Sequence, residues 1–148
     1  MAESPTPAEP LVRPRRVALW LAGVCGLLGA LVANEVVLVL TKPLAPNLFS
    51  LTAGPVAFWT TVGAVGASLV YALVRRLSRR PERSFLIVAI IVLVVSFIPD
   101  LLLFLLPPSP IEQVTVGGVA TLMGMHIVAA VIITAALLRL ARPAPVRA

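Results

Sequence analysis

Three ionisable side chains interrupt long apolar stretches of this 148-residue chain, namely Glu35, Asp100 and His126. A charge at the centre of a bilayer costs at least about 2.5–3.5 kcal/mol on insertion scales, so residues of this kind usually face a protein interior and have a role. Asn34 adds an amide beside Glu35, and Ser96 precedes Asp100 by one helical turn. We therefore expect a polar ligand-binding site built from these five side chains.

The predicted site suits proton or cation chemistry. Two carboxylates at one depth need not both be ionised and can share a proton. A structural role also stays open for each residue, because Glu35 and Asp100 could reach lipid headgroups or water, and Asp100 and His126 could form hydrogen bonds between helices. The residues therefore predict binding of a proton, a cation or a small ligand, with helix packing as the alternative.

No cofactor is predicted. The single cysteine, Cys25, excludes an internal disulfide, a CxxC redox pair and a multi-cysteine zinc site. The single histidine excludes a bis-histidine haem within one chain, and the two methionines that flank it are typical core residues. Glu35, Asp100 and His126 would have to converge from three helices to bind a metal, so no metal site is predicted. Since no nucleophile–base pair appears, an intramembrane enzyme is the weakest hypothesis.

These side chains must be held by membrane-spanning helices. The chain is 59% hydrophobic and only 12% charged, whereas a soluble domain carries about 25% charged residues. Four apolar runs each reach the roughly 20 residues that a hydrocarbon core about 30 Å thick requires, and none alternates in polarity as barrel strands do. We therefore predict an all-α, four-helix transmembrane bundle, with helices at about 17–40, 55–74, 85–106 and 114–140, a disordered tail at 1–16 and a second tail at 141–148. The first run is longer than the apolar core of a signal peptide, so we expect it to be retained.

Helix geometry predicts the depth of the site. At ~1.5 Å per residue, Glu35 and Asp100 lie about 8–9 Å below the outer surface, and His126 lies nearer to the midplane. Pro99 removes the helical hydrogen bond to the carbonyl of Val95, which predicts a kink beside Asp100. The site is therefore expected in the outer half of the bundle.

The basic residues predict the orientation. Arginines lie on one side of the predicted bundle and Lys42 lies on the other, so the positive-inside rule puts the arginine side and both termini in the cytoplasm. The net charge of +6 does not indicate a nucleic-acid partner, because the basic residues flank apolar runs instead of forming a patch with aromatic residues. We expect contacts with anionic lipid headgroups at the predicted cytoplasmic loop, through Arg75, Arg76, Arg79, Arg80 and Arg83.

Small residues indicate how the helices pack. Ala22, Gly26 and Ala30 recur every four residues along the first helix, and such stripes let helix backbones approach closely in lipid. The stripe predicts tight packing inside one bundle, while a face for a homo-oligomer stays open because spacing alone does not separate the two.

Two segments resemble a known family. Ser96-Phe97-Ile98-Pro99-Asp100 and the stretch Leu122 to Ala130, which contains Met125-His126, are similar to a family of small bacterial four-helix integral membrane proteins of unknown function. The resemblance extends from about Leu19 to Leu140 and implies the architecture and a multi-pass location in a bacterial cell membrane. It implies no activity and no functional residues.

A second resemblance concerns Glu35 within Ala33-Asn34-Glu35-Val36. It is similar to the membrane glutamate in the first helix of small multidrug exporters, a pattern in which Asp100 and His126 have no counterpart. The sequence thus leaves three hypotheses: a ligand or ion site, a structural or partner subunit of a membrane complex, and, ranked lower, a transporter of the small multidrug-exporter kind.

Overall fold

The chain folds into long antiparallel helices. The structure, a computed structural model, describes residues 15–44, 51–105 and 114–141. Within these ranges it contains the α-helices α1 (Arg15–Thr41), α2 (Ala53–Leu77), α3 (Pro81–Leu102) and α4 (Val116–Leu140), together with the short 3-10 turns η1 (Lys42–Leu44) and η3 (Leu103–Leu105), and no strand. Each α-helix is long and apolar enough to cross a membrane, which confirms the predicted all-α class.

At the arginine end, α2 and α3 extend beyond the apolar runs from which they were predicted. α2 continues to Leu77 and α3 begins at Pro81, so the predicted loop shrinks to Ser78–Arg80. Proline suits the first helical turn, because its missing N–H is not needed there. The helices therefore include several of the arginines, since backbone hydrogen bonding continues past the last apolar side chain of each run. α4 begins after Thr115, whose hydroxyl accepts a hydrogen bond from the Gly118 N–H at 3.0 Å.

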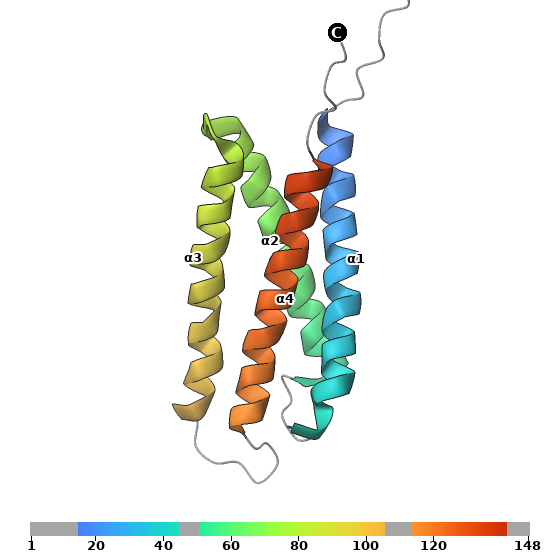
Figure 1. The fold of residues 1–148 in the computed structure, drawn as a ribbon, viewed down its shortest axis with the longest axis vertical. Coiled ribbons are helices and arrows are strands. Elements are labelled where there is room, and N and C mark those ends of the chain that lie inside the picture. Colours follow the sequence, from blue (N-terminus) through green and yellow to red (C-terminus); the bar gives the residue numbers. More distant parts are fainter. Residues whose placement is uncertain (1–14, 45–50, 106–113, 142–148) are drawn as a thin grey trace, which may run out of the picture.

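The helices pack unequally against one another. α1 packs most extensively against α4 and next against α2, whereas α3 makes thinner contacts with α4 and α2. Figure 1 shows α4 between α1 and α3, with α2 crossing behind α4 from the side of α3 to the side of α1. α1 and α3 therefore lie on opposite sides of α4.

Small residues of α1 bring its backbone close to its neighbours. A Cβ atom added at Gly26 would lie 3.3 Å from the Cα of Ile133 on α4, and one at Gly23 would lie 2.8 Å from the Oγ of Ser68 on α2. Ala22 and Ala30 are fully buried in the same stripe. Since burial from lipid gives no hydrophobic driving force, this close approach is what holds the helices together by dispersion contacts.

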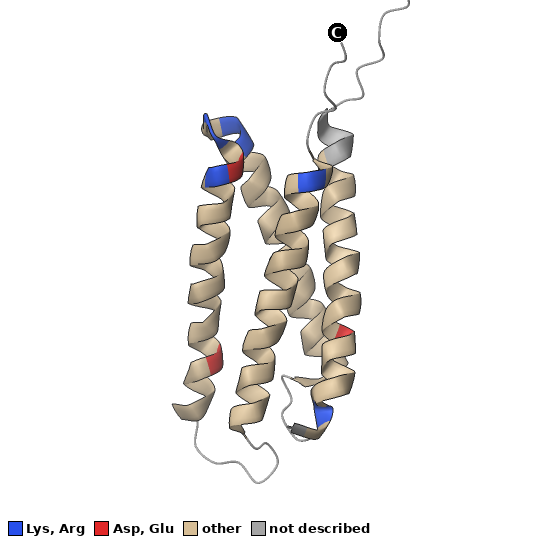
Figure 2. Cartoon of the chain, in the orientation of Figure 1, with Lys and Arg blue, Asp and Glu red and all other residues tan. Residues whose placement is uncertain are grey.

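The outer surface of the helices is almost wholly apolar, as expected where lipid is the solvent. α3 is the extreme case, because Phe85 and Asp100 are its buried residues and most of its leucine, isoleucine and valine side chains are exposed. Charged residues mark the ends. Figure 2 shows lysine and arginine gathered where α2 meets α3 and at the adjacent end of α4. Lys42 begins η1, directly after the other end of α1.

Candidate functional site

The buried acid of α3 meets the single histidine of the chain. The Nδ1 atom of His126 on α4 lies 3.2 Å from the Oδ2 atom of Asp100 on α3, and the Asp100 side chain is only 10% exposed. The sequence places these two residues 26 positions apart on different helices, and the structure brings them into direct contact. This pair is the centre of the candidate site.

The histidine ring is fixed by two further contacts. Its Nδ1 atom lies 2.9 Å from the backbone carbonyl oxygen of Leu122. A carbonyl can only accept, so the Nδ1 atom carries a hydrogen and Nε2 is the ring nitrogen left for proton exchange. Phe97 packs edge-on against the ring, with centroids 6.5 Å apart and an interplanar angle of 89°. With its side chain 37% exposed, His126 is the more accessible partner of the pair.

Asp100 is held close to His126 without a well-formed hydrogen bond. Its Oδ2 atom is buried and has no hydrogen-bond partner of good geometry among the described residues, although Nδ1 is only 3.2 Å away. The two observations agree, because the Nδ1 hydrogen can be aimed well at one acceptor and the Leu122 carbonyl is nearer. A buried carboxylate oxygen that lacks a donor is costly in a low-dielectric interior. It is therefore a good acceptor for an added proton or for a donor on a ligand.

A second polar contact joins α1 to α2. The Nδ2 atom of Asn34 donates a hydrogen bond to the Oγ1 atom of Thr60 at 2.9 Å. Asn34 is 4% exposed and Thr60 is 6% exposed. The amide oxygen of Asn34 is buried and has no partner in the described part of the chain. Asn34 thus belongs to the α1–α2 interface and not to the Asp100–His126 pair.

Glu35 and Ser96 take separate positions. Glu35 is half-buried on α1, and no hydrogen bond or ion pair to another described residue is found for it. Ser96 bonds within its own helix, its hydroxyl donating to the carbonyl of Leu93 at 2.7 Å. Because α1 and α3 flank opposite sides of α4, the five predicted site residues divide into one pair between α3 and α4, one contact between α1 and α2, and two side chains outside both.

The pair does not resemble a metal centre. In the ranges that the structure describes, no group of three or more His, Cys, Asp or Glu residues is arranged to hold a metal ion.

Pro99 lies inside α3, which continues through it to Leu102. The proline therefore sits next to Asp100 without ending the helix.

The comparison with protein families covers nearly the whole chain. Residues 8–143 match a family of unknown function, DUF6069. The chain belongs to this family. The match includes all four helices, the Asp100–His126 pair and the Asn34–Thr60 contact, and it confirms the expected relationship to a family of unknown function. No curated protein and no solved structure matches the chain.

The structure brings the two segments that carried the resemblance together at one point of the fold. Asp100 comes from the segment 96–100 and His126 comes from the segment 122–130, and these are the residues in contact. Sequence reasoning missed the part played by Phe97, which packs on the histidine ring. Its position three residues before Asp100, on the same face of α3, was the signal that could have indicated it.

Proposed function

We propose that this chain is a multi-pass protein of a bacterial cytoplasmic membrane whose Asp100–His126 pair binds a proton, a cation or a small ligand in the outer half of the bundle. The observation that carries the proposal is the contact of 3.2 Å between a buried carboxylate and an imidazole from two different helices. A proton is the occupant that this geometry favours, because the carboxylate oxygen is buried and the smallest ligand needs the least space.

The chemistry of the pair supports proton exchange. Histidine is the side chain that ordinarily changes charge near neutral pH, and an acid at contact distance couples the two titrations. Few other charges act on the pair. In the outer half of the described helices, α2 and α4 contribute none besides His126 itself, and Glu35 and Lys42 both lie on the side of α1. Proton binding at the pair would therefore be governed by these two groups.

The proposed orientation rests on the arginines. The arginine-rich α2–α3 turn and the end of α4 lie at one end of the bundle, which supports a cytoplasmic location for that end and for both termini. The pair then lies toward the opposite, outer face. An ion site there would exchange with the outer solution more readily than with the cytoplasm.

A structural role is the second candidate, and the Asn34–Thr60 contact favours it. That bond is buried between α1 and α2, as expected for a contact that only fixes helix packing. If the Asp100–His126 pair acts in the same way, the chain is a structural or partner subunit of a membrane complex.

The two candidates are separated by the titration of His126. Since the chain contains one histidine, imidazole-labelled protein with a histidine-free affinity tag gives one titration curve by NMR in lipid nanodiscs. We expect reversible titration in the wild type and a changed midpoint in Asp100→Asn. Glu35→Gln is the matched control, because it removes a carboxylate of similar depth that does not contact the ring, and we expect it to leave the midpoint unchanged.

Two results would count against the proposal. One is a histidine that does not titrate between mildly acidic and mildly alkaline pH. The other is a curve that is identical in the wild type and in Asp100→Asn. Either result, with stability lost in Asp100→Asn, would favour the structural candidate.

A further inference from the structure

Two side-chain hydrogen bonds hold the turn between α2 and α3. The hydroxyl groups of Ser78 and Ser84 lie 2.8 Å apart and share a hydrogen bond. The N–H of Arg80 donates to the Ser78 hydroxyl at 3.2 Å. These contacts fix the positions from which the arginine side chains project, so the turn presents its charges in a defined arrangement.

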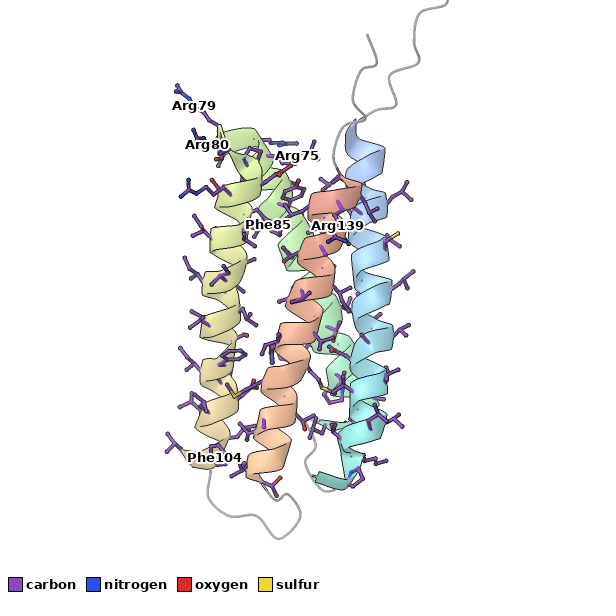
Figure 3. All side chains as sticks on the ribbon, viewed as in Figure 1. Arg75, Arg79, Arg80, Phe85, Phe104 and Arg139 are labelled. Atoms are coloured by element: carbon purple, nitrogen blue, oxygen red, sulfur yellow. The ribbon has the colours of Figure 1, made fainter. Side chains whose placement is uncertain are left out.

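The five arginines of this region differ in what they contact. Arg75 is used inside the protein: its Nη1 atom donates to the carbonyl of Ala141 at 3.3 Å, and its guanidinium lies 5.6 Å from the centre of the Tyr71 ring. The other four, Arg76, Arg79, Arg80 and Arg83, are exposed. Figure 3 shows Arg79 and Arg80 projecting from the end of the bundle, away from Arg139 on α4.

Two of the exposed arginines border a hollow. An open depression of about 380 Å³ is lined by Arg80, Pro81, Glu82 and Arg83. It lies at the N-terminus of the 22-residue helix α3, whose N-cap, Arg80, provides no side-chain cap. The positive end of the helix dipole therefore adds to two guanidinium groups. Guanidinium groups form paired hydrogen bonds with phosphate oxygens, and a hollow of this charge suits a phosphate group.

The position of the hollow favours a lipid as the source of that phosphate. Exposed apolar side chains lie three residues from the lining in each direction along the chain, Leu77 (77% exposed) before Arg80 and Leu86 (44% exposed) after Arg83. The hollow thus lies where membrane-spanning helices leave the apolar phase, which is the level of phospholipid headgroups. We propose that the hollow lined by Arg80 and Arg83 binds the phosphate of an anionic phospholipid, whose acyl chains lie along the exposed faces of α2 and α3. This site is independent of the Asp100–His126 pair.

Glu82 gives the site a second, testable property. Its carboxylate lines the same hollow and lowers the positive potential there, so a headgroup with one negative charge is accommodated more readily than one that carries several. Removing this carboxylate strengthens the attraction for any anion in the hollow.

The test compares two double variants that remove equal charge. Purified full-length protein in neutral detergent is titrated with short-chain phosphatidylglycerol, with phosphatidylcholine and inorganic phosphate as separate arms, and bound lipid is counted by native mass spectrometry. We expect Arg80→Gln/Arg83→Gln to weaken phosphatidylglycerol binding at least roughly tenfold, because the loss of one charge-assisted hydrogen bond alone lowers affinity by about that factor. Arg76→Gln/Arg79→Gln is the matched control and should change it by less than about threefold, because its side chains do not line the hollow.

Several results would overturn the proposal. Equal losses in the two double variants would indicate diffuse attraction to the whole turn. Binding of phosphatidylcholine as tight as that of phosphatidylglycerol would remove the requirement for an anion, and inorganic phosphate that displaces the lipid at similar concentration would make free phosphate the ligand. Glu82→Gln is a second variant on the same surface and should bind phosphatidylglycerol more tightly than the wild type. Unchanged or weaker binding there would place the lipid elsewhere.

Discussion

Phe85 and Asp100 are the two buried residues of α3, and they lie near its opposite ends, roughly 22 Å apart along the helix at ~1.5 Å per residue. Phe85 packs against Tyr71 of α2 with ring centroids 4.8 Å apart and an interplanar angle of 57°, while Asp100 contacts His126 of α4. Between these two points α3 presents mainly exposed apolar side chains. The two buried side chains of α3 thus attach it to the other helices through one aromatic contact and one ionisable contact.

The aromatic attachment predicts an effect of shortening Phe85. We expect Phe85→Ala to lower the free energy of unfolding by about 1 kcal/mol or more, because ring pairs contribute about 0.5–1.5 kcal/mol beyond the area that they bury. Ile91→Ala is the control, since Ile91 is 57% exposed on the same helix and lipid replaces the lost contacts. Equilibrium unfolding in mixed micelles measures both values, and equal losses would contradict the two-point attachment.

The Asn34–Thr60 bond predicts energetic coupling between α1 and α2. A double-mutant cycle with Asn34→Ala and Thr60→Val should give a coupling energy of about 0.6 kcal/mol, and at most about 1.7 kcal/mol, as for other hydrogen bonds between membrane helices. The matched control replaces Thr60→Val by Thr61→Val, because the Thr61 hydroxyl bonds only to the carbonyl of Ala57 in its own helix, at 2.8 Å. Coupling of Asn34 to Thr61 as strong as to Thr60 would show that the measured energy does not come from this bond.

Substitutions at two glycines should change the free energy of unfolding in opposite directions. Gly26→Leu should lower the free energy of unfolding by about 1–3 kcal/mol, the cost of overpacking, because even a Cβ there lies 3.3 Å from the Ile133 backbone. Gly63 has nothing within 4 Å of an added Cβ, so Gly63→Ala should stabilise α2 by up to about 1 kcal/mol through helix propensity. Thermal unfolding of the two variants checks the signs. Destabilisation by Gly63→Ala would show that another molecule occupies that face.

The distribution of basic residues predicts the labelling of single cysteines. In a Cys25→Ser background, Lys42→Cys should react with a membrane-impermeant maleimide in intact cells, whereas Arg79→Cys should react only after the membrane is opened. The reason is that short arginine-rich turns are retained in the cytoplasm. Reaction of Arg79→Cys in intact cells would reverse the proposed orientation.

The helical part of this fold follows from the order of residues along the chain. Four runs long enough for hydrocarbon leave the backbone no alternative to internal hydrogen bonds, and the structure accordingly has helices at each of them. The ends of α2 and α3 were less predictable, because apolar runs mark where lipid ends, while helices such as α2 and α3 continue through Arg75 and Arg83. The stripe of Ala22, Gly26 and Ala30 indicated close packing, yet its spacing did not indicate that the partner of Gly26 lies on α4.

The residue types alone determined that this chain forms helices long and apolar enough to cross a membrane, and that Asp100 and His126 interrupt their apolar runs. The helix pairing was decided by the tertiary structure. Depth along a helix can be counted from the sequence, and it put Asn34, Glu35 and Asp100 at one level. Lateral position depends on which helices touch, and since α4 separates α1 from α3, Asn34 bonds to Thr60 while Asp100 meets His126. In lipid every apolar face packs almost equally well against every other, so the side-chain pattern carries little information about that choice.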